Sequence, residues 1–319
     1  MVAKITAMQE PDASLVIVNY RTPELTDRCL SLAGEAADGL VLERVVVDNA
    51  SGDGSAARLR DRHPGLTVVE EPANRGFAAG VNAGFAATSA AFVLVLNPDT
   101  EPQPGAFRRL VEHLRRSEGT GVAAPLLQHP GGGVQRNAHR RFPNLLTLFV
   151  DFCVPLGYLL ALRPELHPHE LSEGETERGG AAAHVNGAAL AIRRSAYEAA
   201  GGFDEGFFMY LEETEWQQRV HRSGWAIEVV PSARVTHLTR AGAGMAAITD
   251  RYLPSVYRYM ALQGHRGRSV DLVLTVATAM SRATLAASAR VFPSRRESAL
   301  ELLEFHRAVA RWVKQRRAR

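Results

Sequence analysis

Three acidic side chains follow a run of aromatic residues in segment 207–216, which reads FFMYLEETEW. A helix is expected over 212–223, and Glu212 and Glu213 stand at its start, where carboxylates favour the helix dipole. A carboxylate delivered beside apolar walls can also keep a raised pKa and act as a general base. The motif therefore indicates either a catalytic base or simply the start of a helix.

Two predicted strands near the start of the chain end in polar side chains. The strand over 14–19 ends in Asn19, and the strand over 44–48 ends in Asp48. Nucleotides bind at the carboxyl edge of an open parallel sheet, so Asp48 can accept hydrogen bonds from a base or a ribose there. A turn in the segment DNASGDG uses the same residue types and is the simpler alternative.

A third predicted strand, over 92–97, runs into Asn97 and Asp99. A divalent cation, Mg²⁺ or Mn²⁺, needs few protein oxygens when a diphosphate supplies the rest. Asp99 is therefore a candidate metal ligand, with Asn97 nearer the ribose, and a plain Asn-Pro-Asp turn is the alternative. His237 ends a short predicted strand later in the chain. A lone histidine is more often structural, and this one completes a metal shell only if folding returns it to Asp99.

Segment 74–84, which reads NRGFAAGVNAG, places glycines four residues apart. This spacing puts them on one face of a helix, where a backbone can approach another closely. The pattern is not the G-x-G-x-x-G of dinucleotide sites, and tight packing of a helix on a sheet explains the glycines. Arg75 stands at the start of that helix, where it could face a phosphate.

Strand and helix patterns alternate through the first part of the chain, and this rhythm predicts an α/β fold with a Rossmann-like, mostly parallel sheet flanked by helices. Helical spacing is expected over 23–36, 54–62 and 76–88, and strands over 66–70, 188–193 and 225–230 in addition to those above. Regularity fails over 131–180, where glycines, prolines and histidines indicate loops around one apolar segment. From residue 252 onward the pattern is helical, and the main boundary is expected near 242–250.

Charge is distributed unevenly along the 319 residues. The formal net charge is +3, but residues 251–319 contain 14 Lys and Arg against 4 Asp and Glu. A basic helical region suggests an anionic partner, either a membrane surface or nucleic acid. Nucleic acid is not expected as a partner, because aromatic residues are not interleaved with the basic ones beyond Trp312 and no recognition motif occurs. A solvated helix face, and C-terminal helices that pair two copies of the chain, are the alternatives. The side chains expected at anionic headgroups are Arg311, Lys314, Arg316, Arg317 and Arg319.

Two further features concern the compartment. Cys29 and Cys153 are far apart, which fits a reducing, cytoplasmic setting. The first residues lack the pattern of a secretory signal. The longest apolar stretch, 145–162, is interrupted by Asp151 and Pro155 and is shorter than the roughly 20 residues that span a bilayer, although contact with the membrane stays open.

Taken together, the segments resemble the family 2 glycosyltransferases, specifically the bacterial rhamnosyltransferase-like branch that builds cell-wall and O-antigen polysaccharides. The resemblance covers roughly residues 14–264, and the order of its motifs makes it specific. The motifs are VIVNY at 16–20, VVDNAS at 46–51, NRGF at 74–77, LNPD at 96–99, NGA at 186–188 with Arg193, GFD at 202–204 leading to Glu215, and His237.

The resemblance implies a GT-A fold and an inverting glycosyltransferase. It implies a catalytic domain over 1–250, with a nucleotide half over about 1–127 and an acceptor half over about 128–250, followed by a basic helical region over 251–319. It also implies a nucleotide-sugar donor, with dTDP-rhamnose favoured, and a lipid-linked or glycan acceptor. An enzyme with a lipid-linked acceptor would work at the cytoplasmic, inner face of the membrane.

The resemblance also implies roles for matched positions. Asp48 would bind the base, and Asn97 and Asp99 would form a variant metal motif with His237 near the diphosphate. Our own hypothesis adds that the cation and Arg75 neutralise the departing diphosphate. The base comes from the acidic motif, which commonly reads Glu-Asp-x-Asp in relatives and Glu-Glu-Thr-Glu here. We favour Glu213 over Glu212, and the longer side chain at 213 leaves both open.

Two other functions fit parts of the pattern. A nucleotidyltransferase would share the sheet and the metal, but segment 19–23, NYRTP, lacks the glycine-rich, basic loop that holds a triphosphate. A non-catalytic scaffold that binds sugar nucleotides should have lost its acids, whereas Asp99 and Glu213 are present.

Overall fold

A nine-stranded mixed sheet forms the centre of the molecule. The computed structural model describes residues 10–238, 245–291 and 296–318. The strand order is β3-β2-β1-β4-β10-β6-β11-β5, and β8 pairs with β11. The strands are β1 (Ala13–Asn19), β2 (Leu42–Asp48), β3 (Thr67–Glu70), β4 (Phe92–Leu96), β5 (Thr100–Pro102), β6 (Thr120–Gln128), β8 (Gly180–Ala182), β10 (Ala189–Arg193) and β11 (Ala226–His237), with a separate pair β7 (Ala138–His139) and β9 (His184–Val185). The predicted α/β class is confirmed.

The first four strands are parallel and form the Rossmann-like part. β1 lies between β2 and β4, and its last residue, Asn19, is in register with Asp48 at the end of β2. Every residue of β1 and β4 is buried, as expected for strands covered on both faces. The two predicted strand ends therefore do lie side by side at the carboxyl edge of the sheet.

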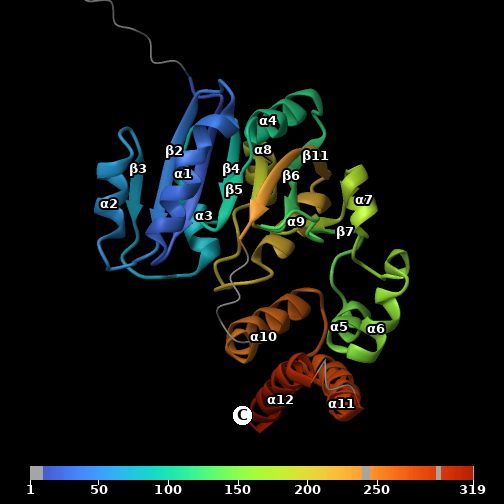
Figure 1. Ribbon diagram of the computed structural model, residues 1–319. Helices are drawn as coiled ribbons and strands as arrows, with labels where there is room; N and C mark the ends of the chain where they lie inside the picture. The colour runs from blue at the N-terminus through green and yellow to red at the C-terminus, as the bar shows by residue number, and fades with distance from the viewer. Residues whose placement is uncertain (1–9, 239–244, 292–295, 319) are drawn as a thin grey trace, which may run out of the picture.

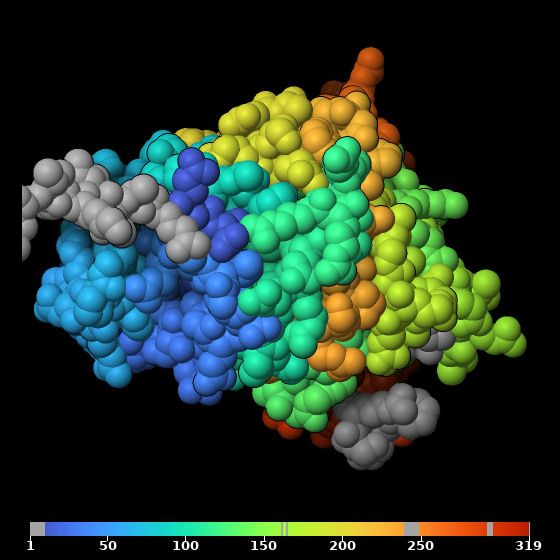
Figure 2. Space-filling model, turned by 90° about the horizontal axis from the view of Figure 1, so that it is seen from above, coloured from blue at the N-terminus to red at the C-terminus, as the bar shows by residue number. Residues whose placement is uncertain are grey.

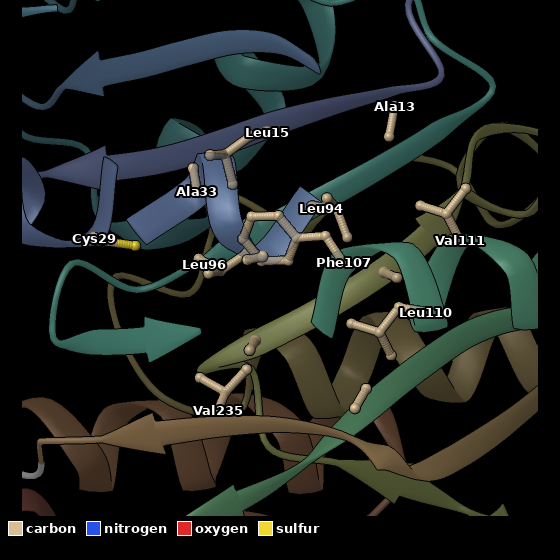
Figure 3. Packing of buried hydrophobic residues seen from close by; sticks show 14 of the residues in the cluster. Ala13, Leu15, Cys29, Ala33, Leu94, Leu96, Phe107, Leu110, Val111 and Val235 are labelled. Atoms are coloured by element: carbon tan, nitrogen blue, oxygen red, sulfur yellow. The ribbon is translucent and has the colours of Figure 1, made fainter. Parts of the chain in front are cut away.

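Helices cover both faces of the sheet because side chains alternate along each strand. On one face, residues such as Leu94 and Leu96 pack against α1 (Pro23–Ala37), α2 (Ser55–Arg62) and α4 (Ala106–Arg116). Figure 3 shows Phe107 of α4 against these leucines. On the other face, residues such as Val93 and Val95 pack against α3 (Phe77–Ala86), α8 (Arg194–Ala200) and α9 (Glu212–Arg222).

The second half of the sheet departs from a purely parallel arrangement. β10 is antiparallel to both β4 and β6, so this one strand runs against its two neighbours at the centre of the sheet. β11 is longer than the predicted strand over 225–230. Its pairing with β6 shifts register between Val230 and Arg234, and the strand then continues to His237. The short strand expected to end at His237 is thus the last part of β11. Seen from above, the orange segment of β11 lies beside green segments of the second half (Figure 2).

The irregular segment and the C-terminal region together form a helical layer. The apolar stretch divides at Cys153 into α5 (Leu145–Phe152) and α6 (Val154–Ala161), since Pro155 lies in the first turn of α6. A short 3₁₀ turn, Pro164–Leu166, and α7 (Glu173–Arg178) follow. α5 shares a hydrophobic core with α10 (Met245–Leu262), α11 (Gly267–Val291) and α12 (Arg296–Ala318). Figure 1 shows these helices below the carboxyl ends of the parallel strands.

α11 is the helix of the described chain that is long and apolar enough to cross a membrane, with a mean hydropathy of 1.4 and 28% of its apolar window buried. Its buried face includes Leu274, Ala277 and Leu285. Its exposed face carries Leu272, which is 63% exposed, and Met280, which is 44% exposed.

The basic side chains of α12 serve different purposes. Arg316 donates to both oxygens of Asp271 and stacks on Tyr257, and Arg317 pairs with the same carboxylate. Trp312 packs against the Tyr257 ring. Two of the cations expected at headgroups, Arg316 and Arg317, are thus engaged within the fold, and contact of α12 with headgroups stays a prediction. Arg311 and Lys314 are exposed, and Arg319 and residues 242–244 of the expected boundary lie outside the described residues.

Candidate active site

A cleft of about 510 Å³ opens at the carboxyl edge of the sheet, where β1, β4 and β11 end. Parallel strands gather the residues that follow them at this edge, which explains why distant segments meet here. The polar side chains that line the cleft are Tyr20, Thr22, Asn49, Asn74, Asn97, Asp99, Asn186, Tyr210, Glu212, Glu213 and His237. Five of the predicted site residues, Asn97, Asp99, Glu212, Glu213 and His237, are thus brought together.

Asp99 and His237 face one another across the end of β11. The Nε2 atom of His237 lies 3.6 Å from Oδ1 of Asp99, and the Leu238 N–H donates to the Asp99 carbonyl at 2.8 Å. The Nδ1 atom of His237 lies 3.0 Å from Oε1 of Gln135, whose amide nitrogen donates to the His237 carbonyl. Because an amide oxygen only accepts, Nδ1 carries a proton, and Nε2 is the nitrogen that faces Asp99. An imidazole nitrogen and a carboxylate oxygen held in this way suit a divalent cation.

Glu212 and Glu213 start α9 at another wall of the cleft. Burial raises the pKa of Glu212 well above its ordinary value, and the neighbouring charge of Glu213 adds to this effect. Burial also raises the pKa of Glu213, but backbone N–H groups of Gly187, Thr214 and Glu213 itself oppose the shift. More backbone N–H groups stabilise the charge of Glu213 than that of Glu212, which favours Glu213 as the ionised member of the pair. Oε2 of Glu212 and Oε2 of Glu213 are both buried without a hydrogen-bond partner among the described residues, so this feature does not distinguish the two acids.

A strained turn delivers the two acids to the cleft. Tyr210 and Leu211 have φ of 73° and 65°, values that L-residues rarely adopt. Such strain persists only where surrounding structure enforces it, and it is typical of functional sites. The Ser255 hydroxyl of α10 donates to the Met209 carbonyl at 2.7 Å, so the C-terminal helices help to hold the turn.

The start of α3 holds the same turn from the other side. The Phe77 N–H donates to the Phe208 carbonyl at 3.0 Å. Gly76 has φ of 93°, and a Cβ there would collide with the backbone of Phe208. At Gly80 a Cβ would lie 2.6 Å from Val18, so this glycine allows α3 to pack on β1, as the spacing predicted.

Asn19 and Asp48 are buried in a hydrogen-bonded network beneath the cleft. Nδ2 of Asn19 donates to Oδ1 of Asp48 at 2.7 Å, and Ser51 donates to Asp48 from both its N–H and its hydroxyl. Neither side chain lines the cleft, whereas their neighbours Tyr20 and Asn49 do. The structure therefore places Asn19 and Asp48 where they fix the ends of β1 and β2, and their direct contact with a base or ribose stays a prediction.

The structure does not bring Arg75 to the cleft. Its guanidinium pairs with Glu71 at 2.9 Å and with Glu205 at 2.7 Å, beside a separate shallow depression. These carboxylates raise the pKa of Arg75 and draw the side chain away from the carboxyl edge. A phosphate contact was expected because Arg75 stands at the start of a helix. In the structure Glu71 and Glu205 bind its guanidinium instead.

Several residues of the site were not assigned a role from the sequence. Gln135, which orients His237, lies in the irregular segment 131–180. Asn186 and Gly187 line the cleft, and Gly187 packs against Glu213 so closely that a Cβ would lie 3.1 Å from its Cγ. The NGA motif was recognised only as part of a resemblance. Hydrogen-bonding capacity near the end of β6 is the feature that could have drawn attention to Gln135.

The comparison with known families agrees with this geometry. The profile of glycosyl transferase family 2 matches residues 14–200, which include β1 to β10 and the Asp99 side of the cleft. The chain therefore belongs to glycosyl transferase family 2 and is a glycosyltransferase, which sets the nucleotidyltransferase alternative aside.

Two curated relatives have named activities. The N-acetylglucosaminyl-diphospho-decaprenol L-rhamnosyltransferase of Mycobacterium tuberculosis is 31% identical over 225 residues, which are 65% of this chain and 69% of that protein. The low-salt glycan biosynthesis hexosyltransferase Agl10 of Haloferax volcanii is 29% identical over 224 residues, which are 69% of this chain and 64% of that protein.

Solved structures show the same fold. The mannosyltransferase PcManGT of Pyrobaculum calidifontis, in complex with GDP-Man and Mn²⁺, has a TM-score of 0.58 at 16% identity and covers 95% of this chain and 87% of its own. GalNAc-T7 with UDP, GalNAc and Mn²⁺ has a TM-score of 0.58 at 15% identity and covers 78% of this chain, which spans 48% of that protein. The predicted GT-A fold is confirmed.

Proposed function

We propose that the protein is an inverting glycosyltransferase that moves a sugar from a nucleotide-sugar donor to a lipid-linked or glycan acceptor. The observation that carries the proposal is the pair of buried acids, Glu212 and Glu213, in the same cleft as Asp99 and His237. One wall offers a proton acceptor and the other offers ligands for a diphosphate-bound cation. Inversion needs these two functions on opposite sides of the anomeric carbon.

The donor binds across the carboxyl edge of the sheet in this proposal. Asp99 and His237 would hold a divalent cation, Mn²⁺ or Mg²⁺, which supplies charge stabilisation to the leaving diphosphate when it is bound. Asn97 lies at the end of β4 beside Asp99 and would bind the ribose. Arg75 takes no part, because its charge is engaged by Glu71 and Glu205.

Glu213 then removes the proton from the acceptor hydroxyl. Its side chain lines the cleft, and the N–H groups around its carboxylate favour the ionised form. A positioned general base of this kind contributes a factor of about 10² to 10⁴ in rate. Glu212 keeps its proton, so it places no second negative charge beside Glu213.

The similarity to the mycobacterial rhamnosyltransferase supports rhamnose as the transferred sugar and a polyprenyl-diphosphate sugar as the acceptor, and dTDP-rhamnose is the donor we propose. A lipid-linked acceptor would bring the protein to the cytoplasmic face of a membrane. The exposed apolar face of α11 and the exposed cations Arg311 and Lys314 suit such a surface.

The test is transfer by Glu213→Gln and Glu212→Gln variants, after a panel of nucleotide sugars with Mn²⁺ has identified the donor that is hydrolysed or that raises the melting temperature. Glu213→Gln should lower kcat by about 10² to 10⁴ while the donor Kd stays within twofold. Glu212→Gln, which mimics the protonated side chain, should retain much more activity. Full activity of the Glu213→Gln variant would remove this residue from the role of base.

A further inference from the structure

A cluster of histidines and acids lies outside the cleft, where α5 meets the segment that follows the 3₁₀ turn. Nε2 of His169 lies 3.3 Å from Oδ1 of Asp151, which is on α5. A ligand atom from each of Asp151, His167 and His169 falls within 4.8 Å of the others. The His167 and His169 side chains are only 13% and 5% exposed, whereas that of Asp151 is 34% exposed.

The spacing within this cluster suits a shared cation. Zinc–nitrogen and zinc–oxygen bonds of about 2.0–2.2 Å in a tetrahedron place two ligand atoms about 3.4 Å apart. The 3.3 Å between His169 and Asp151 is close to that value. Two imidazoles and one carboxylate form a common ligand set for zinc, and the partial exposure of Asp151 lets water supply the fourth ligand.

Neighbouring rings keep the histidines uncharged. His169 stacks on His139 and His139 on His184, with centroid distances of 5.5 and 4.2 Å. Burial and the nearby histidines lower the pKa of His139 to about 3 and that of His169 to about 4. Burial raises the pKa of Asp151 to about 8, so binding of a cation would displace a proton from this carboxyl group. Nδ1 of His169 has no hydrogen-bond partner among the described residues, and Nε2 is the nitrogen that faces Asp151.

We propose that Asp151, His167 and His169 bind a divalent transition-metal ion of the zinc type, separate from the pair formed by Asp99 and His237. The ion would tie two parts of the fold together. Asp151 is on α5, which is anchored in the helical layer by Leu148 and Phe152. His169 is anchored beside the sheet, because its carbonyl accepts the Arg140 N–H at 2.7 Å.

His167 is the ligand that has to move. Its Nδ1 accepts the Glu170 N–H at 3.0 Å, and coordination requires the ring to shift and release this hydrogen bond. Asp151 and His169 are already close enough to bind together. Loss of either side chain should therefore weaken binding of the ion more than loss of His167.

The test separates the two metal sites by substitution. Zn²⁺ is titrated calorimetrically into chelator-treated protein as wild type, Asp99→Asn, Asp151→Asn and the Asp99→Asn/Asp151→Asn double variant. Co²⁺ is used in parallel, since its visible absorption reports tetrahedral coordination. Asp151→Asn preserves shape at a partly exposed position and so keeps the fold, which circular dichroism checks.

In the Asp99→Asn background, Asp151→Asn should weaken Zn²⁺ binding at least tenfold and abolish the rise in melting temperature that Zn²⁺ produces. His169→Asn should do the same, His167→Asn should have a smaller effect, and His265→Asn, outside both sites, should have none. Equal Zn²⁺ affinity of the Asp99→Asn protein with and without Asp151→Asn would overturn the proposal. Because the readout is binding, the result does not depend on glycosyl transfer.

Discussion

Glu212 and Glu213 are neighbours in sequence that have been given different environments. Glu213 is surrounded by backbone N–H groups that favour its charge, whereas Glu212 is 5% exposed and has the charge of Glu213 beside it. Two titratable groups whose environments push their pKa values apart are a common basis for acid and base assignment. The cost of burying Glu212 should be visible in stability.

Glu212→Gln should stabilise the protein, and more so as the pH rises. Burial raises the pKa of Glu212 above its unfolded value of 4.5, so its contribution to stability is fully present below that pH and is lost as the pH rises through the folded pKa. Each pKa unit corresponds to about 1.4 kcal/mol, and 1 kcal/mol moves the melting temperature of a large domain by about 2–4 °C.

Calorimetric scans at pH 4 and pH 8 measure this effect. The melting temperature of Glu212→Gln relative to wild type should be higher at pH 8 than at pH 4. Glu301→Gln, on the exposed face of α12, serves as the control and should show no such trend. A gain that is the same at both pH values would show that Glu212 is not held in its protonated form.

Gln135 acts on the candidate metal pair through the His237 ring. Gln135→Leu removes the acceptor of the Nδ1 proton, so the tautomer with a free Nε2 loses its support. Loss of an outer partner of this kind typically costs 10-fold to 100-fold in metal affinity. Mn²⁺ titration followed by electron paramagnetic resonance should show this loss, and Gln135→Glu, which keeps an acceptor, should restore most of it. Equal Mn²⁺ affinity of the leucine variant and wild type would contradict the assignment.

At the scale of elements, the turn before α9 is held from two directions. α3 holds it through the hydrogen bond between Phe77 and Phe208, and α10 holds it through Ser255 and through Arg258, which pairs with Asp204 at 2.7 Å. The acids at the start of α9 are therefore positioned by helices from both ends of the chain. Fixing a catalytic group in this way matters because small displacements are costly to the rate.

Gly76→Ala should displace this turn. The added Cβ meets the backbone of Phe208, which cannot yield as a flexible side chain would. We expect a loss of several kcal/mol of stability or a much lower kcat. Gly132→Ala is the matched control, because Gly132 has φ of 94° and open space around it, so it carries the same backbone strain without the collision. Melting temperature and transfer rate should both separate the two variants, and equal effects would attribute the loss to φ alone.

The parts of the fold that follow local rules could be predicted from the sequence. The alternation of buried strands with helices predicted β1 to β4 and α1 to α3 nearly to the residue. The polar residues that follow the strands predicted that Asp99 lies in the cleft. The reversal at β10 depends on its pairing with β4 and β6, which no local pattern records. Arg75 was misplaced for a similar reason, since Glu205 approaches it from a distant segment.

At the scale of the whole molecule, the carboxyl edge of the sheet and the helical layer lie on the same side (Figure 1). An acceptor carried on a lipid would reach the cleft from this side if the helical layer rests on the membrane. The exposed apolar face of α11 offers Leu272, Val276 and Met280, spaced four residues apart on the side opposite its buried residues. An apolar face exposed in this way is typical of helices that lie in the membrane interface.

Replacing Leu272, Val276 and Met280 together with serine should release the protein from anionic vesicles. A fully buried aliphatic side chain contributes about 1.5–3 kcal/mol, so even partial insertion of three side chains predicts a Kd at least tenfold higher. Flotation with phosphatidylglycerol vesicles measures the change, and Ala57→Ser, at an exposed position of α2 in the Rossmann-like part, is the control. Arg311→Gln/Lys314→Gln should weaken binding at 0.1 M salt and matter less at 0.5 M, because salt screens exposed charges. If the triple variant bound vesicles as wild type does and instead changed the oligomeric state, the face of α11 would pair two copies of the chain and the membrane assignment would fail.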